Sequence, residues 1–166
     1  MSSKIRRHII LLQRRKIVAN ALIIFASLTG NTEEMAEIVA AELEAHDIDV
    51  EILDVMQADV EEFLDYDICL VGSYTYGVDG VLPDEMIDFH EELGELDLSG
   101  KVFGVFGSGD DFYEVFCAAI DFFEDQFKTT GATQGGESVK INLNAEEEDV
   151  ERLKALAASI AEKVAD

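Results

Sequence analysis

The sequence predicts an α/β fold of three layers, in which helices cover both faces of a doubly wound, five-stranded parallel sheet of order 2-1-3-4-5. Apolar runs typical of buried strands alternate along the chain with stretches of helical period. The 166 residues suit one domain with a sizeable core. Hydrophobic residues make up 48% and charged residues 29%, a composition typical of folded globular proteins.

The first expected strand, residues 21–26, is the continuous apolar run ALIIFA, as expected where both faces are buried. Residues 31–46 follow as a helix, with Met35, Ile38, Val39 and Leu43 in one stripe. The remaining strands are expected at 49–53, 68–72, 101–107 and 138–143. The remaining helices are expected at 58–64, 83–93, 113–130 and 145–164, of which 58–64 is weak and irregular. Pro83 suits the first turn of its helix.

The net charge of −24 is unevenly distributed. Residues 1–16 hold six basic residues and no acid, whereas the rest of the chain holds 36 acids against six bases, a net charge of −30. An acidic body repels nucleic acid and anionic membranes and attracts basic protein surfaces, although it also serves solubility alone. The longest early apolar run is too short to span a membrane.

The basic segment 1–17 is expected to be a disordered extension, followed by a single domain at 18–166. A targeting peptide and an anion-binding arm are the competing interpretations of this segment. A secretory signal is disfavoured, because its apolar stretch is short and no small-residue cleavage site follows.

Cys69 and Cys117 lie far apart in apolar runs, without metal-binding or disulfide spacing, which predicts buried free thiols in a reducing cytoplasm. The three histidines, His8, His46 and His90, fall outside the loops discussed next, so we expect each at the surface.

The loop after the first strand, residues 27–32, reads SLTGNT and leads directly into a helix. A helix N-terminus offers unpaired N–H groups and a partial positive charge, which suits a phosphate. The loop has no Lys or Arg, so it is not a P-loop. The alternative interpretation is an ordinary N-cap by Asn31 or Thr32.

Residues 23–39 resemble the flavodoxin signature at every position that the pattern specifies. The resemblance implies a short-chain bacterial flavodoxin, in which this loop binds the phosphate of FMN. The loop at 73–80 is glycine-rich and resembles the T-Y-T-[WY]-G loop of the same family. That likeness implies that Tyr76 flanks one face of the flavin and that the Gly77 carbonyl accepts a hydrogen bond from reduced N5. Without this resemblance, we would expect the Tyr76 side chain to pack against its own domain.

The stretch at 107–117 resembles G-x-G-D-x-x-Y-x-x-F-C of short-chain flavodoxins. Its glycines can direct N–H groups at the flavin, Asp110 can meet the ring edge and Tyr113 can cover the second face. The alternative is a tight turn and a helix start, with Phe116, Phe122, Phe123 and Phe127 in the core. The long insertion that splits the fifth strand of long-chain members is not found.

The residues expected to bind the cofactor are Ser27, Leu28, Thr29, Gly30, Asn31, Thr32, Tyr74, Thr75, Tyr76, Gly77, Gly107, Ser108, Gly109, Asp110, Tyr113, Phe116 and Cys117. The resemblance implies a low-potential one-electron carrier that uses non-covalent FMN and is not an enzyme. Its expected partners are basic-faced redox proteins, such as a flavodoxin/ferredoxin reductase and low-potential acceptor enzymes. A cytoplasmic monomer without nucleic-acid or membrane partners is expected.

Other functions fit this fold less well. A response-regulator receiver needs an Asp at the end of the third strand, where this chain has Val71, Gly72 and Ser73, and a Lys after the fifth strand, which is also missing. An FMN-dependent reductase, a flavoprotein that activates a metalloenzyme and an FMN-free module remain alternatives. A flavin spectrum of the purified protein supports a carrier, and NAD(P)H oxidation without a reductase favours an enzyme.

Val78 departs from the family pattern, in which Asp or Gly often follows the glycine. A β-branched residue disfavours the positive φ that a peptide flip at this turn requires. We therefore expect Val78→Gly to raise the maximal population of one-electron-reduced flavin in a redox titration. An unchanged or lower population would contradict this hypothesis.

Overall fold

The computed structural model describes residues 18–75, 82–111 and 116–165, so the basic segment 1–17 lies outside the described residues. The strands are β1 (Asn20–Phe25), β2 (Asp49–Asp54), β3 (Ile68–Tyr74), β4 (Val102–Gly109), β5 (Thr133–Gln134) and β6 (Val139–Asn142). The α-helices of this part are α2 (Asn31–Ala45), α3 (Asp84–Leu93), α4 (Ala118–Thr129) and α5 (Glu147–Ala165). Two short 3-10 helices, η1 (Val55–Gln57) and η2 (Val60–Asp65), follow β2.

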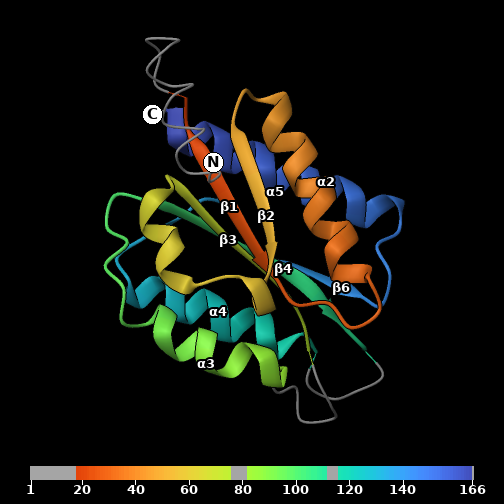
Figure 1. Cartoon of the computed structure of the whole chain (residues 1–166). Coiled ribbons are helices and arrows are strands. Elements are labelled where there is room, and N and C mark those ends of the chain that lie inside the picture. The colour runs from red at the N-terminus through yellow and green to blue at the C-terminus, as the bar shows by residue number, and fades with distance from the viewer. Residues whose placement is uncertain (1–17, 76–81, 112–115, 166) are drawn as a thin grey trace.

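The strands form one parallel sheet of order β2-β1-β3-β4-β5, which confirms the expected fold class. Helices α2 and α5 cover one face, and α3 and α4 cover the other (Figure 1). Successive side chains of a strand point to opposite faces, so Ile23 enters the cluster under α2 and α5 while Leu22 and Ile24 enter the opposite one. Of the helices described, none has both the length and the apolar character needed to span a membrane.

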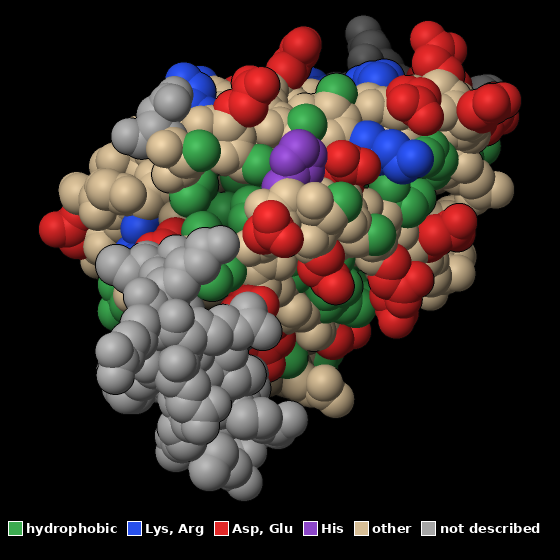
Figure 2. All heavy atoms as spheres, turned by 90° about the horizontal axis from the view of Figure 1, so that it is seen from above, with side chains coloured by type: hydrophobic (Ala, Val, Ile, Leu, Met, Phe, Trp, Pro, Cys, Tyr) green, Lys and Arg blue, Asp and Glu red, His purple; other side chains and the backbone are tan. Residues whose placement is uncertain are grey.

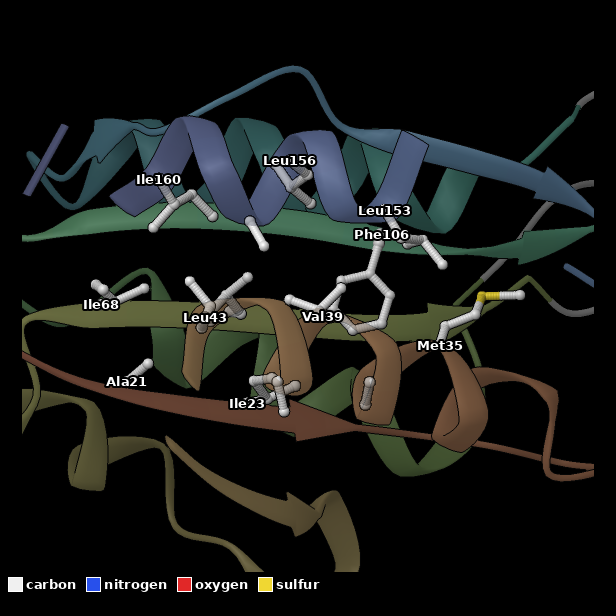
Figure 3. Close-up of a cluster of buried hydrophobic side chains, with 14 of the residues drawn as sticks. Ala21, Ile23, Met35, Val39, Leu43, Ile68, Phe106, Leu153, Leu156 and Ile160 are labelled. Carbon is white, nitrogen blue, oxygen red and sulfur yellow. The ribbon is translucent and has the colours of Figure 1, made fainter. Parts of the chain in front are cut away.

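The cluster under α2 and α5 forms because both helices carry an apolar stripe of period 3.6. Figure 3 shows Met35, Val39 and Leu43 of α2 on the same side of the sheet as Leu153 and Ile160 of α5. All five of these side chains are fully buried. Burial of each such side chain contributes roughly 1.5–3 kcal/mol, so this interface is a major part of the stability.

The fifth position of the sheet differs from expectation, because two short strands occupy it instead of one strand at 138–143. Strands β5 and β6 both pair with β4; the Gly135 N–H still donates to the Phe103 carbonyl of β4 at 2.8 Å, and residues 136–138 then separate it from β6. Glu124 of α4 holds this interruption, since its Oε1 accepts hydrogen bonds from Gln134 at 2.8 Å and Ser138 at 2.7 Å. Burial alone would raise the pKa of Glu124, but these bonds and the Lys128 ammonium outweigh it and lower the pKa.

Two helix predictions were wrong in detail. The helix expected at 113–130 begins at Ala118, because Cys117 adopts a left-handed conformation with φ 54° that no α-helix continues. Helix 58–64 is instead the 3-10 helix η2, which Asp59 and Glu62 close with a capping box. Phe123 and Phe127 are buried as expected, whereas Phe122 lies off the apolar stripe of α4 and is 45% exposed.

Strands β3 and β4 approach closely at two glycines. A Cβ on Gly107 would overlap the Ser73 carbonyl oxygen of β3 and lie 2.5 Å from Ile120 Cδ1. A Cβ on Gly72 would overlap the ring of Phe106. Both glycines are therefore required by packing in the sheet, whether or not a ligand is present.

Both cysteines are free thiols that lie buried in the core. Both side chains have no exposed surface, and burial raises the pKa of Cys69 and of Cys117 from 9.0 to about 12. We expect both thiols to react slowly with a disulfide reagent at pH 8 in the folded protein and rapidly in urea. Above pH 9 the unfolded chain loses thiol protons that the folded chain retains, so the free energy of unfolding should fall as pH rises toward 12. Rapid labelling of either folded thiol would contradict this assignment.

Gly107→Ala tests the close approach of β3 and β4. The added methyl group would overlap backbone atoms, which cannot move away as a flexible side chain can. We therefore expect the free energy of unfolding of the apoprotein, measured by urea titration, to fall by about 2 kcal/mol. Gly94→Ala is the matched control, since its Cβ would meet the end of the flexible Gln126 side chain. Equal losses in the two variants would refute a specific constraint at Gly107.

Candidate functional site

Strands β1, β3 and β4 end side by side at the carboxyl edge of the sheet, where three loops begin (Figure 1). The strand order reverses between β1 and β3, and such reversal points are where doubly wound folds bind ligands. Backbone hydrogen bonds continue past the strand ends, from Ala26 N–H to the Gly72 carbonyl and from Thr75 N–H to the Ser108 carbonyl, both at 3.0 Å. These bonds hold the starts of the three loops together.

The loop after β1 leaves the N-terminus of α2 without a side-chain cap. Gly30 is the N-cap residue with φ 92°, which a residue with a Cβ rarely adopts. Its N–H donates to Ser27 Oγ at 2.9 Å, which closes the turn. The N-cap by Asn31 or Thr32 that we considered as an alternative is not formed, since both residues lie inside the helix.

The first turn of α2 therefore keeps its N–H groups available for an anion. Thr29 is exposed and Asn31 is half-buried, so both can add side-chain donors, whereas Thr32 is buried beneath them. Leu28 is 71% exposed. An uncapped helix end with hydroxyl and amide groups and no cation fits a phosphate.

The loop after β3 is described only at its two ends, because Tyr76, Gly77 and Val78 lie outside the described residues. Tyr74 is half-buried, and its hydroxyl donates to Glu85 Oε1 of α3 at 2.5 Å. Thr75 Oγ1 accepts the N–H of Ala119 at 3.4 Å, so it caps the first turn of α4. Both side chains anchor the loop to helices.

Gly109 is the last residue of β4, and the loop after it begins at Asp110, which is half-buried. Ser108 is buried in the strand, and Tyr113 lies outside the described residues. A Cβ on Gly109 would lie 2.8 Å from Cys117 Sγ, so close packing accounts for this glycine too.

Phe116 and Cys117 end the same loop. Phe116 is half-buried and packs against the cluster under α3 and α4, while Cys117 is fully buried with its Sγ 3.7 Å from the Ile141 carbonyl oxygen. The packing of Phe116 supports the alternative interpretation, in which its side chain belongs to the core. Burial gives Cys117 a packing role behind the loop.

Sequence reasoning missed three residues that hold these loops. Asn142 ends β6 and bonds Asp111 in the loop after β4, and Leu143, the next residue, bonds the Gly109 carbonyl at the end of β4. Glu85 of α3 receives the Tyr74 hydroxyl. No local motif marks any of them, because each acts on a residue from another part of the chain.

The described residues contain no group of three or more His, Cys, Asp or Glu side chains that could hold a metal ion. His46 is exposed beside Glu42, and half-buried His90 contacts the Phe122 carbonyl, so the two described histidines are remote from the three loops. Among the described residues, the loop after β1 therefore offers a ligand hydrogen-bond donors without a metal-binding cluster.

Comparisons with known proteins agree with this geometry. The flavodoxin family profile matches residues 23–155. Probable flavodoxin 2 of Bacillus subtilis is 41% identical over 147 residues, which cover 88% of this chain and 97% of the relative. A solved flavodoxin from Streptococcus strain TIGR4 is 53% identical with a TM-score of 0.85, covering 87% of this chain and 99% of its own.

A short-chain flavodoxin associated with a bacterial microcompartment is also similar, at 44% identity and a TM-score of 0.85 over 88% of this chain and 99% of its own. The profile and these relatives extend over the strands and loops that form the site. The chain therefore belongs to the flavodoxin family, whose members are electron-transfer proteins that bind FMN.

Proposed function

We propose that the loops after β1, β3 and β4 hold one FMN, with which this chain carries single electrons between redox proteins at low potential. The observation that carries the proposal is the uncapped N-terminus of α2 at Gly30, beside the point where the strand order reverses. Bound FMN supplies the one-electron chemistry, and the chain supplies binding, orientation and charge.

The residues proposed to hold the phosphate are Ser27, Thr29, Gly30, Asn31 and Thr32, with Leu28 beside them. Ser27 shapes the turn through its bond to Gly30 N–H, while Thr29 and Asn31 present donors at the surface. The first-turn N–H groups of α2 complete the cradle. A neutral cradle of this kind suits a phosphate that stays bound.

The ring is proposed to lie against the loops after β3 and β4. The site residues expected there are Tyr74, Thr75, Tyr76, Gly77, Gly107, Ser108, Gly109, Asp110, Tyr113, Phe116 and Cys117. Among the described ones, Tyr74 and Thr75 fix the loop, and Gly109 and Asp110 line its neighbour. Cys117 and Gly107 contribute through packing behind the loops.

Charge is proposed to serve both the potential and the partners. Asp110, Asp111 and Glu85 lie on the elements that carry the loops, and their carboxylates oppose further negative charge in the site, which lowers a reduction potential. Figure 2 shows that Asp and Glu side chains are also spread over the visible part of the end opposite these loops. The acidity is therefore general, and it favours partners with basic faces, such as a flavodoxin/ferredoxin reductase or a low-potential acceptor enzyme.

A monomer in the cytoplasm is part of the same proposal. The two cysteines are buried and unpaired, which suits a reducing compartment. The rest of the chain after residue 16, with 36 acids against six bases, repels nucleic acid.

Thr29→Asp tests the phosphate cradle. A carboxylate at the end of α2 repels a phosphate, so we expect the dissociation constant of FMN, measured by quenching of flavin fluorescence, to rise roughly a hundredfold. The dissociation constant of riboflavin, which has no phosphate, should change little.

Thr129→Asp is the control for net charge, because Thr129 lies at the C-terminus of α4, near the opposite edge of the sheet. Its FMN affinity should match that of the wild type. If wild-type apoprotein takes up no FMN, or if Thr29→Asp weakens FMN and riboflavin equally, the proposed phosphate site is wrong.

A further inference from the structure

The successive residues Asn142 and Leu143, at the end of β6 and in the turn after it, contact the end of β4 and the loop that follows. The backbone N–H of Asp111 donates to Asn142 Oδ1 at 3.0 Å, and the N–H of Leu143 donates to the Gly109 carbonyl at 2.8 Å. Gly109 and Asn142 are also the last pair in register between the two strands. The sheet ladder therefore continues into the loop, and its final contact uses the side chain of Asn142.

Leu143 adopts an unfavourable backbone conformation in this turn. Its φ is 59°, in the left-handed region that is unfavourable for residues with a Cβ. The side chain is 52% exposed, so burial offsets little of this penalty. Such conformations persist where surrounding contacts impose them, and here the Gly109 carbonyl is the contact that Leu143 gains.

The other end of the same loop also rests on β6. Cys117 Sγ lies 3.7 Å from the Ile141 carbonyl oxygen, and it packs on Gly109, the last residue of β4 before the loop. Residues 141–143 therefore contact the loop both where it leaves β4 and where it enters α4. We call residues 141–143 the β6 clamp.

Lys140, the residue directly before the β6 clamp, is held from two sides. Lys140 Nζ forms an ion pair with Asp121 of α4 at 2.8 Å, and the Lys140 carbonyl accepts a hydrogen bond from Arg152 of α5 at 3.0 Å. Contacts from α4 and α5 therefore fix the strand just before the clamp, and the clamp can in turn position the loop after β4.

We propose that Asn142 is a positioning residue for the flavin site: its Oδ1 accepts the Asp111 N–H and so fixes Asp110 and Asp111 at the start of the loop proposed to line the ring. The inference rests on the proposed function, since that function assigns this loop to the flavin. Asn142 lies on β6, outside the three loops, and it acts on the cofactor through the loop without touching it. The substitution Asn142→Ala would leave the Asp111 N–H without this acceptor oxygen.

Three full-length variants loaded with FMN test the proposal. Asn142→Ala removes the acceptor, and Asn142→Asp retains an acceptor oxygen at the same place. Asn144→Ala is the matched control, because it truncates an exposed asparagine two residues further along the same turn. Hydrogen exchange of the Asp111 amide, the dissociation constant of FMN and the midpoint potential of the bound flavin are measured for each.

We expect Asn142→Ala to speed exchange of the Asp111 amide roughly fivefold or more and to weaken FMN binding by a similar factor, with a shifted midpoint potential. Asn142→Asp should restore slow exchange and FMN affinity, whereas Asn144→Ala should match the wild type. The urea midpoint of each apoprotein reports whether the variant folds.

Unchanged exchange in Asn142→Ala would overturn the proposal, because the hydrogen bond would then not order the loop. Faster exchange with unchanged FMN affinity and potential would also overturn it and leave a bond that only stabilises the fold. Failure of wild-type protein to bind FMN would instead refute the proposed function, and exchange in the apoprotein would still report on the Asp111–Asn142 bond.

Discussion

The backbone hydrogen bonds of a sheet buried on both faces constrain the rest of this structure. Helices exclude water from each face, so the interior strands must satisfy their N–H and C=O groups within the sheet. Strands β1, β3 and β4 do so in parallel register, and they end at the same edge. The loops that follow them are thereby brought together, although they are separated by dozens of residues in sequence.

This constraint also explains the glycines near the site. Gly107 lets the β4 backbone approach the Ser73 carbonyl, Gly109 admits the sulfur of Cys117, and Gly72 admits the ring of Phe106. A glycine beside a ligand-binding loop is readily interpreted as a residue that the ligand requires. Here Gly107 and Gly109 are needed by neighbouring chain atoms, whereas the left-handed conformation of Gly30 opens a helix end toward solvent.

The sequence predicted the sheet order and the loop after β1 well, because both depend on local patterns. Doubly buried strands are continuous apolar runs, and a helix N-terminus follows directly from the order of elements. What sequence missed depends on contacts between distant residues. Cys117, whose left-handed conformation makes α4 begin later than expected, contacts Gly109 and Ile141. The interruption between β5 and β6 depends on hydrogen bonds to Glu124. Asn142 carries no motif for the same reason, while Tyr76, Gly77 and Tyr113 remain predictions.

The interruption between β5 and β6 has a further consequence for how copies of this chain meet one another. An open sheet has two edges, and a long straight edge strand pairs readily with a second molecule. One edge here is broken into two short strands with Gly135 and Gly136 between them. The other edge, β2, carries Asp49, Glu51 and Asp54, whose charges would repel a second copy of the same strand. Neither edge offers a continuous uncharged template, which protects a concentrated protein against edge-to-edge aggregation.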